Sequence, residues 1–295
     1  MRRRGQTRAV LAVVTAAVLA TGCGAFGGDG ARDSGTGATR SAPKPVPVWN
    51  RSPDSIAAVG DSITRGFDAC TVFSDCPEVS WATGSDAGVD SLAVRLLGVT
   101  GAAERSWNYA VTGARMADLP GQMEQAVARR PELVTVMAGA NDACRASVSS
   151  MTSVAGFRAD FEKALSALRT ALPKTQVYVA SVPNLKRLWS KGRMDPLGKQ
   201  VWKLGICPSM LGDADDLTDT AALRREKVQR RVEEYNAVLR EVCAKDRRCR
   251  FDGNAVFDYR FDTGQLSHWD WFHPSRTGQA RLAEIAYRTV TARRP

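Results

Sequence analysis

Short apolar segments alternate with longer segments of helical periodicity along most of the 295-residue chain. The apolar segments, which predict β-strands, cover residues 55–59, 105–110, 133–138, 176–181 and 250–252. The helical periodicity covers residues 89–97, 116–129, 154–172, 222–245 and 276–291. Strands that alternate with helices along a chain usually form a parallel sheet with helices on both faces. The pattern therefore predicts an α/β fold.

Residues 154–172 show the helical pattern most clearly. Their apolar side chains include Phe157, Phe161, Ala164, Leu165 and Leu168, which are spaced mainly three or four positions apart. This spacing places them on one side of a helix, as expected for a helix that packs on a sheet.

A basic segment followed by an apolar one begins the chain. Four arginines within the first eight residues precede a run of twelve apolar or small residues, 9–20, and Gly22 and Cys23 follow shortly after it. A span across a bilayer takes about 20 residues, so this shorter run is typical of an export signal. Cysteine at this point predicts a lipoprotein-type signal over residues 1–22, cleaved before a lipid-modified Cys23. An ordinary secretory signal and a retained anchor are the alternatives.

Residues 23–47 are rich in small and polar residues and include three prolines near their end, at positions 43, 45 and 47. Such a composition builds no core, so we interpret the segment as a flexible tether between membrane and domain. Residues 48–295 are long enough to form a single domain with a sizeable core. The expected location is the extracytoplasmic face of the cell membrane, or the medium if the protein is secreted.

Cysteine usage agrees with export. The chain has seven cysteines, and six remain when Cys23 is set aside. An even number in an exported domain indicates three disulfides, for which six cysteines allow fifteen pairings. Closeness in sequence favours Cys70 with Cys76, Cys243 with Cys249 and, from the remainder, Cys144 with Cys207. With no Cys-x-x-Cys motif and only two histidines, the sequence offers little support for a metal site.

The formal net charge of +10 raises the question of nucleic-acid binding. Removing the four arginines of the signal leaves 37 basic residues against 31 acidic ones, a net charge of +6. The densest basic cluster lies within residues 224–231 of one predicted helix, and we interpret it as a solvated helix face. No nucleic-acid partner is expected.

The first candidate functional segment is a turn after the first predicted strand, where Gly60, Asp61 and Ser62 follow residues 55–59. Such a turn can present a serine hydroxyl at the edge of an α/β sheet, although Gly-Asp-Ser is also an ordinary turn sequence. Three more segments follow in order: Asn-Tyr-Ala-Val-Thr-Gly at 108–113, Gly-Ala-Asn-Asp at 139–142 and Asp-Trp-Phe-His-Pro at 270–274.

Together the four segments resemble the signature blocks of the SGNH (GDSL-type) hydrolases, named for their Ser, Gly, Asn and His. The resemblance spans roughly residues 54–290, and the cysteine pattern looks closest to that of secreted bacterial esterases and lipases. It implies a three-layer α/β/α sandwich with a five-stranded, flavodoxin-like parallel sheet. In such a sheet the loops after the first three strands meet at one edge, which brings distant blocks into one site.

The chemistry of ester cleavage then assigns a role to each block. Ser62 would be the nucleophile and His273 its general base, because the ordinary pKa of histidine, about 6.5, suits proton transfer near neutrality. Asp270, three positions earlier, would orient the imidazole. The expected oxyanion donors are the backbone N–H groups of Ser62 and Gly113 and the side-chain amide of Asn141.

Other polar residues receive lesser roles. Asp61 and Asp142 match family positions that we interpret as loop-bracing. His268, the other histidine, lacks the motif context and is expected at the surface or the pocket edge. No metal or cofactor is required by this chemistry.

Two segments without a clear pattern, residues 67–88 and 183–220, are expected to set specificity. The first carries Trp81, and the second carries Trp189 and Trp202. These side chains favour an apolar ester or an acyl chain, although packing within the loops explains them equally well.

We therefore expect an exported, monomeric serine ester hydrolase acting on lipid or other acyl esters. The alternatives are a carbohydrate or peptidoglycan O-deacetylase and a non-catalytic surface lipoprotein that retains the fold.

Overall fold

Five strands form the central sheet of the computed structural model, which describes residues 49–293. They are β1 (Ile56–Gly60), β2 (Ser106–Asn108), β3 (Leu133–Met137), β4 (Gln176–Val179) and β5 (Cys249–Phe251). Their spatial order is β2-β1-β3-β4-β5, and every neighbouring pair is parallel. The expected α/β class and flavodoxin-like order are thus confirmed.

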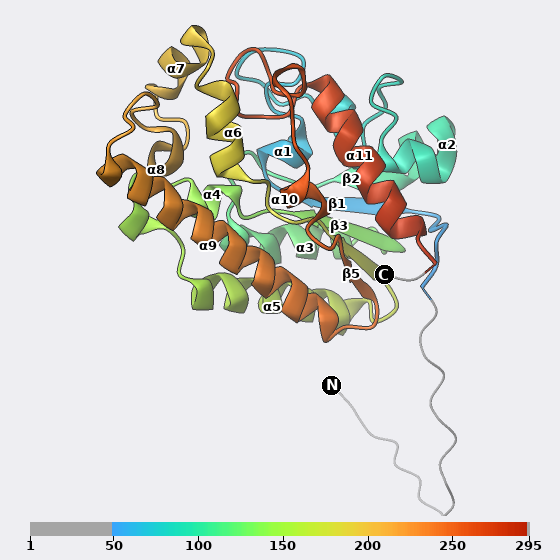
Figure 1. Cartoon of the computed structure of the whole chain (residues 1–295). Coiled ribbons are helices and arrows are strands. Elements are labelled where there is room, and N and C mark those ends of the chain that lie inside the picture. Colours follow the sequence, from blue (N-terminus) through green and yellow to red (C-terminus); the bar gives the residue numbers. More distant parts are fainter. Residues whose placement is uncertain (1–48, 294–295) are drawn as a thin grey trace, which may run out of the picture. The chain divides into compact units, whose positions relative to one another are not determined.

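Long helices cover both faces of the sheet (Figure 1). Helices α3 (Leu119–Val127), α5 (Val154–Ala171) and α9 (Asp219–Ala244) pack on one face, and α2 (Leu92–Arg105) and α11 (Arg276–Thr291) pack on the other. Successive strand residues point to opposite faces, so Ala57 joins the first core and Ala58 the second. The result is the predicted three-layer arrangement.

Helix α5 agrees closely with the predicted span. It begins after Ser153, whose hydroxyl accepts a hydrogen bond from the backbone N–H of Gly156, and its expected apolar side is buried. Helix α2 starts after a Ser91 cap, and its bounds reach Arg105. Gly98, with φ of +72°, is not helical, so a first stretch ends at the predicted residue 97 and a second, unpredicted stretch follows the kink.

The interpretation of residues 183–220 as irregular is wrong. The segment contains three short helices: α6 (Leu185–Gly192), α7 (Pro196–Trp202) and α8 (Pro208–Leu211). Asn184 and Asp195 cap the first two by accepting backbone N–H bonds, and α7 and α8 each begin with proline. The capping signals were present in the sequence, but each helix is too short to show a clear apolar periodicity.

Residues 67–88 are largely irregular, as expected, with one 3₁₀ turn, η1 (Pro77–Val79). The smaller elements of the fold are α1 (Ser62–Arg65), α4 (Ala140–Ala143), α10 (Ala255–Asp258), η2 (Met116–Asp118), η3 (Val148–Ser150) and η4 (Thr263–Gln265). Most of them lie in connections between the long helices and the strands.

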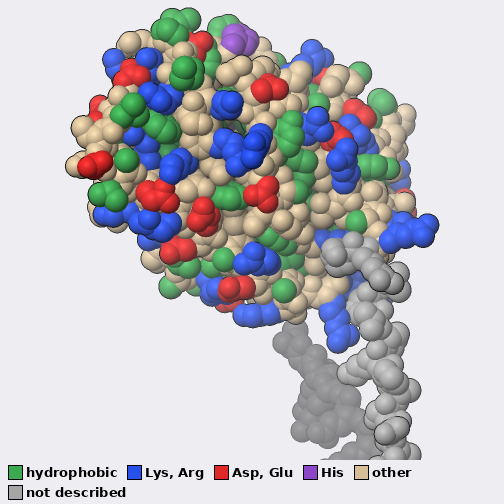
Figure 2. Space-filling model, in the orientation of Figure 1, with side chains coloured by type: hydrophobic (Ala, Val, Ile, Leu, Met, Phe, Trp, Pro, Cys, Tyr) green, Lys and Arg blue, Asp and Glu red, His purple; other side chains and the backbone are tan. Residues whose placement is uncertain are grey.

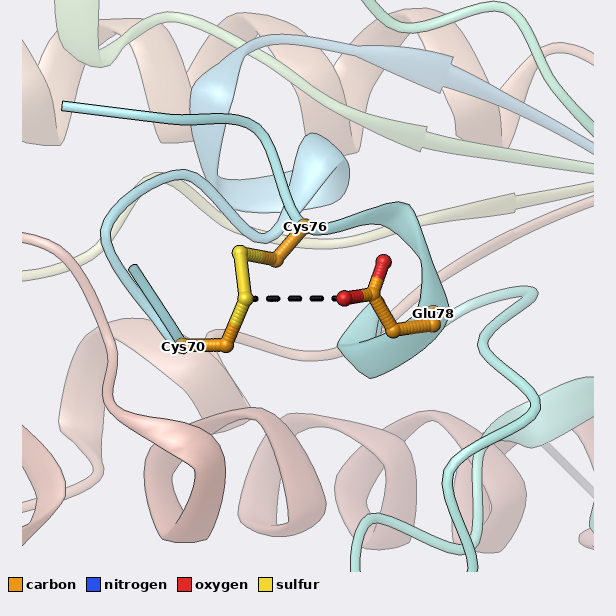
Figure 3. Close-up of side chains that lie close together, drawn as sticks. All are labelled: Cys70, Cys76 and Glu78. Atoms are coloured by element: carbon orange, nitrogen blue, oxygen red, sulfur yellow. Dashed lines mark hydrogen bonds between the residues drawn. A yellow bond between two sulfur atoms is a disulfide. The ribbon is translucent and has the colours of Figure 1, made fainter. Parts of the chain in front are cut away.

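Three disulfides join the pairs favoured by sequence: Cys70 with Cys76, Cys144 with Cys207 and Cys243 with Cys249. Cys144 follows α4 and Cys207 precedes α8, so their bond ties the segment with the three short helices to the loop after β3. Figure 3 shows the bond from Cys70 to Cys76 beside the carboxylate of Glu78, 3.5 Å from one sulfur. Because both sulfurs are used in the disulfide, this group is a poor ligand set for a metal ion.

The interpretation of the basic cluster as a solvated face is wrong for Arg225. This side chain is 1 % exposed, and its guanidinium lies 4.2 Å from the centre of the Trp189 ring. It donates hydrogen bonds to the carbonyl groups of Met210, Gly212, Asp213 and Asp216. Arg225 therefore holds together the segment before α9. On the face in Figure 2, basic and acidic side chains are interspersed.

The predicted signal, the lipidation site at Cys23 and the tether of residues 23–47 lie outside the described residues. Within residues 49–293, no helix combines the length and the apolar character that crossing a bilayer takes.

Candidate active site

Strand order brings the signature blocks to one edge of the sheet. Ser62 is the first residue of α1, directly after β1 and Asp61, while Gly113 follows β2 and Asn141 lies in α4 after β3. Because β2 and β3 flank β1, the loops that follow these three strands are neighbours. This edge also contains the point where the strand order reverses, which is where open α/β sheets bind ligands.

The turn before Ser62 needs glycine at position 60. Gly60 has φ of +150°, and a Cβ atom there would lie 2.2 Å from the carbonyl oxygen of Met137 on the neighbouring strand. The side chain of Gln122 bonds both backbone groups of Gly60, accepting from its N–H at 2.7 Å and donating to its carbonyl at 2.9 Å. The end of β1 is therefore fixed by buried contacts.

Asp61 stabilises the turn by a hydrogen bond, and its buried carboxyl group affects the electrostatics of the site. One of its carboxyl oxygens accepts a hydrogen bond of 3.0 Å from the backbone N–H of Ile63. The other is buried, and no hydrogen-bond partner for it occurs within residues 49–293. Burial raises the pKa of Asp61 to about 7, against the opposing effects of the Ile63 bond and of the charge on His273. Asp61 thus holds the turn by its bond to Ile63, and burial favours the neutral form of its carboxyl group.

A continuous chain of hydrogen bonds joins Ser62, His273 and Asp270. Nε2 of His273 lies 2.8 Å from Oγ of Ser62, and Nδ1 lies 2.5 Å from Oδ2 of Asp270. Asp270 is fully buried, and the other two residues are each less than 10 % exposed. Ser62 lies far from His273 and Asp270 in the sequence. Along the chain of hydrogen bonds, the three side chains follow one another as nucleophile, base and orienting acid do in a catalytic triad.

Hydrogen bonds within the loop, and one from α7, stabilise the conformation of the loop that carries Asp270 and His273. Oδ1 of Asp270 accepts the backbone N–H groups of Phe272 and His273, each at 2.9 Å. Its carbonyl oxygen accepts a bond of 2.8 Å from the indole N–H of Trp202, the last residue of α7. Helix α11 starts after a Ser275 cap, so His273 lies in the loop before it, as expected.

The protonation states follow from these contacts. Burial alone would lower the pKa of His273, but the charge and hydrogen bond of Asp270, with the charges of Asp61 and Asp68, raise it overall. Burial would raise the pKa of Asp270, but the charge of His273 and the hydrogen bonds from His273 and the backbone lower it. The pair therefore favours an ionised Asp270 beside an imidazole that readily accepts a proton.

Two of the predicted oxyanion donors, Gly113 and Asn141, lie in segments that hydrogen bonds join. The side-chain amide of Asn141 donates to the carbonyl of Ala114 at 3.0 Å, which links α4 to the loop of Gly113. Asp142 ties the same two segments, because its carboxylate accepts the backbone N–H of Met116 at 2.9 Å. The second amide hydrogen of Asn141 is not used in the bond to Ala114.

Sequence reasoning missed Gln279, a fully buried residue of α11. Its side chain donates to the carbonyl of Ile63 at 2.9 Å and accepts from the backbone N–H of Trp81 at 3.0 Å. It therefore joins α1, which carries Ser62, to the segment 67–88. A signal was available: Gln279 lies three to four positions before Leu282 and Ala283, on the apolar side of the helix.

Other side chains and cavities surround the hydrogen-bonded chain at different distances. His268 is exposed, in agreement with its expected surface position. The ring of Phe67 lies 5.0 Å from the ring of His273. Two cavities of about 400 and 490 Å³ have Trp202 and Trp189, respectively, in their walls. Their described lining residues do not include Ser62 or His273.

Comparison with known proteins identifies the family. The family model described as GDSL-like lipase/acylhydrolase matches residues 56–286. No relative among the proteins with curated descriptions matches the sequence. The chain belongs to the GDSL-like lipase/acylhydrolase family, and its activity class is that of an acyl ester hydrolase.

Several solved structures are similar to this chain. The lipase Lip_vut3 from a goat rumen metagenome has 16 % identity and a TM-score of 0.50, with coverage of 81 % of this chain and 98 % of that one. An extracellular lipase of Streptomyces rimosus has 16 % identity and a TM-score of 0.47, with coverage of 79 % and 99 %. A family 3 carbohydrate esterase of Clostridium thermocellum has 14 % identity and a TM-score of 0.47, with coverage of 80 % and 94 %. At 16 % identity, the likeness to Lip_vut3 concerns the fold alone.

Proposed function

We propose that this protein is an exported serine ester hydrolase that forms an acyl-enzyme at Ser62. The observation that carries the proposal is the buried chain of hydrogen bonds from Ser62 through His273 to Asp270. A serine hydroxyl is a weak nucleophile until a base removes its proton, and the imidazole nitrogen at 2.8 Å is in reach to do so.

In the first half of the reaction, Oγ of Ser62 attacks the ester carbonyl carbon while Nε2 of His273 takes the hydroxyl proton. The carbonyl oxygen becomes an oxyanion, which the backbone N–H groups of Ser62 and Gly113 and the amide of Asn141 stabilise. Each well-placed donor of this kind is worth about 3 kcal/mol in the transition state. His273 then gives its proton to the leaving alcohol, and the acyl group stays on Ser62.

In the second half, a water molecule attacks the acyl-enzyme and His273 accepts its proton. The carboxylic acid leaves when the proton returns to Oγ of Ser62. Throughout, Asp270 keeps Nδ1 of His273 protonated and stabilises the imidazolium by its negative charge. No cofactor or metal ion takes part in any of these steps.

The test is hydrolysis of p-nitrophenyl esters from acetate to palmitate by the full-length protein and its Ser62→Ala variant. Activity that disappears in the variant, with unchanged circular dichroism, supports the serine mechanism. A preference for acetate directs the assignment to the deacetylase alternative, and a preference for long chains to a lipase. Absence of hydrolysis on the whole series would refute the proposal and favour the non-catalytic alternative.

Export and lipid attachment are a separate part of the proposal. They rest on the basic and apolar N-terminus, the cysteine at position 23 and the three disulfides, which are typical of oxidising compartments. Labelling with a radioactive fatty acid in a bacterial host that processes lipoproteins should mark the wild type but not Cys23→Ser. Equal labelling of both proteins, or labelling of neither, would contradict lipidation at Cys23.

A further inference from the structure

Asp68 is a second buried carboxyl group beside Asp270. It lies in the segment that follows α1, it is 1 % exposed, and one of its carboxyl oxygens lies within 4.8 Å of a carboxyl oxygen of Asp270 and of a ring nitrogen of His273. The catalytic roles proposed for Ser62, His273 and Asp270 do not involve Asp68.

Backbone contacts lock Asp68 in this place. Its N–H donates to the carbonyl of Ser74 at 3.0 Å, and its carbonyl accepts the hydroxyl of Ser267 at 2.6 Å. The N–H of Ser267 in turn donates to the carbonyl of His273 at 2.7 Å. Asp68 is therefore attached to the loop that carries the base and the acid, and its φ of +57° is a left-handed conformation that few side chains adopt without cost.

The two oxygens of the Asp68 carboxyl group have different surroundings. Oδ1 accepts the backbone N–H of Phe73. Oδ2 is buried, and within residues 49–293 no N–H or O–H group donates to it. Asp270, in contrast, is surrounded by donors, because it accepts two backbone N–H groups and Nδ1 of His273.

Two adjacent carboxyl groups in a buried site hold one proton between them, since like charges at short range oppose ionisation of both. The donors around Asp270 stabilise its charge, so the proton belongs on Asp68, whose free oxygen can then donate. We propose that Asp68 is a positioning residue of this site: its carboxyl group shares a proton with that of Asp270 and so controls how strongly Asp270 holds His273. This inference rests on the proposed function.

The electrostatics agree with this assignment. Burial first, and then the nearby negative charge of Asp270, raise the pKa of Asp68 to about 6. The charged groups that face Asp68 are Asp270 and His273, and those that face His273 are Asp270, Asp61 and Asp68. The charge of Asp142 also raises the pKa of Asp61.

A direction for the pH dependence follows. When Asp68 loses its proton, it adds a negative charge near His273 and raises the pKa of that imidazole. Hydrolysis needs the neutral imidazole, so an ionised Asp68 moves the acid limb of the kcat/KM profile to higher pH. Asp61 titrates in the same range, and for this reason the inference is tested by comparing variants rather than by the wild-type profile alone.

The informative variant is Asp68→Asn. Asparagine accepts the N–H of Phe73, tolerates a left-handed backbone and donates a permanent hydrogen bond toward Asp270, so it imitates the protonated aspartate. Asp68→Gly adopts the same backbone at no steric cost but has no donor. Glu104→Gln, at an exposed position of α2, is the control for a loss of one negative charge.

We expect Asp68→Asn to retain most of kcat while its acid limb lies at lower pH than that of the wild type. Asp68→Gly should lose about tenfold in kcat, because it cannot form the hydrogen bond to Asp270 that we assign to protonated Asp68. Glu104→Gln should match the wild type in both respects. An acid limb that does not move in Asp68→Asn, or equal kcat in the asparagine and glycine variants, would overturn the proposal.

A second readout does not depend on turnover. The chain has two histidines, so proton NMR resolves the imidazole of His273 once His268→Gln removes the other signal. The titration midpoint of His273 should fall in Asp68→Asn, and an unchanged midpoint would refute the inference. If the wild type hydrolyses no ester, the proposed function fails, while this titration still decides the role of Asp68.

Discussion

Replacing Gln279 should destabilise the fold and the position of Ser62 together. The side chain forms hydrogen bonds with two buried backbone groups, the carbonyl of Ile63 and the N–H of Trp81. A buried polar group left without a partner costs about 1–3 kcal/mol. Two such groups predict that Gln279→Met, which keeps the volume but neither hydrogen bond, lowers the free energy of unfolding by about 2–6 kcal/mol.

The assay is urea unfolding followed by circular dichroism, with kcat measured under native conditions on the best ester. Because Ile63 directly follows Ser62 in α1, kcat should fall more than KM changes. Gln200→Ala, on the exposed side of α7, is the matched control and should alter stability by no more than about 0.5 kcal/mol. A loss below about 1 kcal/mol in Gln279→Met, equal to that of the control, would refute the reasoning.

Three further predictions test the site and its frame. His273→Ala should abolish ester hydrolysis while His268→Ala retains most of it, and the reverse result would overturn the assignment of the base. Because burial raises the pKa of Asp61 to about 7, its carboxyl contributes stability below its ordinary pKa that is lost as pH rises through 7. Asp61→Asn should therefore show a flatter decline in unfolding free energy between pH 4 and pH 8, and parallel curves would contradict this. Replacing Cys144 and Cys207 by alanine opens a loop of 63 residues and should cost about 4 kcal/mol in thermal or urea unfolding. The same change at either pair separated by 6 residues should cost only about 2 kcal/mol, and equal losses would count against loop closure as the cause.

Much of the fold could be predicted because local patterns and global structure agree. The three inner strands, β1, β3 and β4, are short, mainly apolar runs buried on both faces. Their alternation with helices leaves few possible topologies. The long helices α5, α9 and α11 were predicted nearly to their ends, since their apolar sides repeat over many residues. The short helices of residues 183–220 escaped prediction because one or two turns show no clear period.

Around the site, too, some residues could be predicted from the sequence and others could not. Ser62, Asp270 and His273 could be named from motif order, and the structure brings all three into one hydrogen-bonded chain. The environments of Arg225 and Asp68 could not be predicted, because a charged residue in a helix or loop is ordinarily solvated. Arg225 is buried only because four carbonyl groups and the Trp189 ring converge on it.

The sequence by itself determined the α/β class, the order of the elements and the residue types that the chemistry needs. These properties depend on periodicity, on turn residues and on motif spacing, all of which are local. Tertiary structure alone decided which carboxyl groups lie close together, which side chains are desolvated and how close His273 lies to Ser62, 211 positions away in the chain. Such quantities depend on distance and on exclusion of water, and only the packed sheet and its loops establish both.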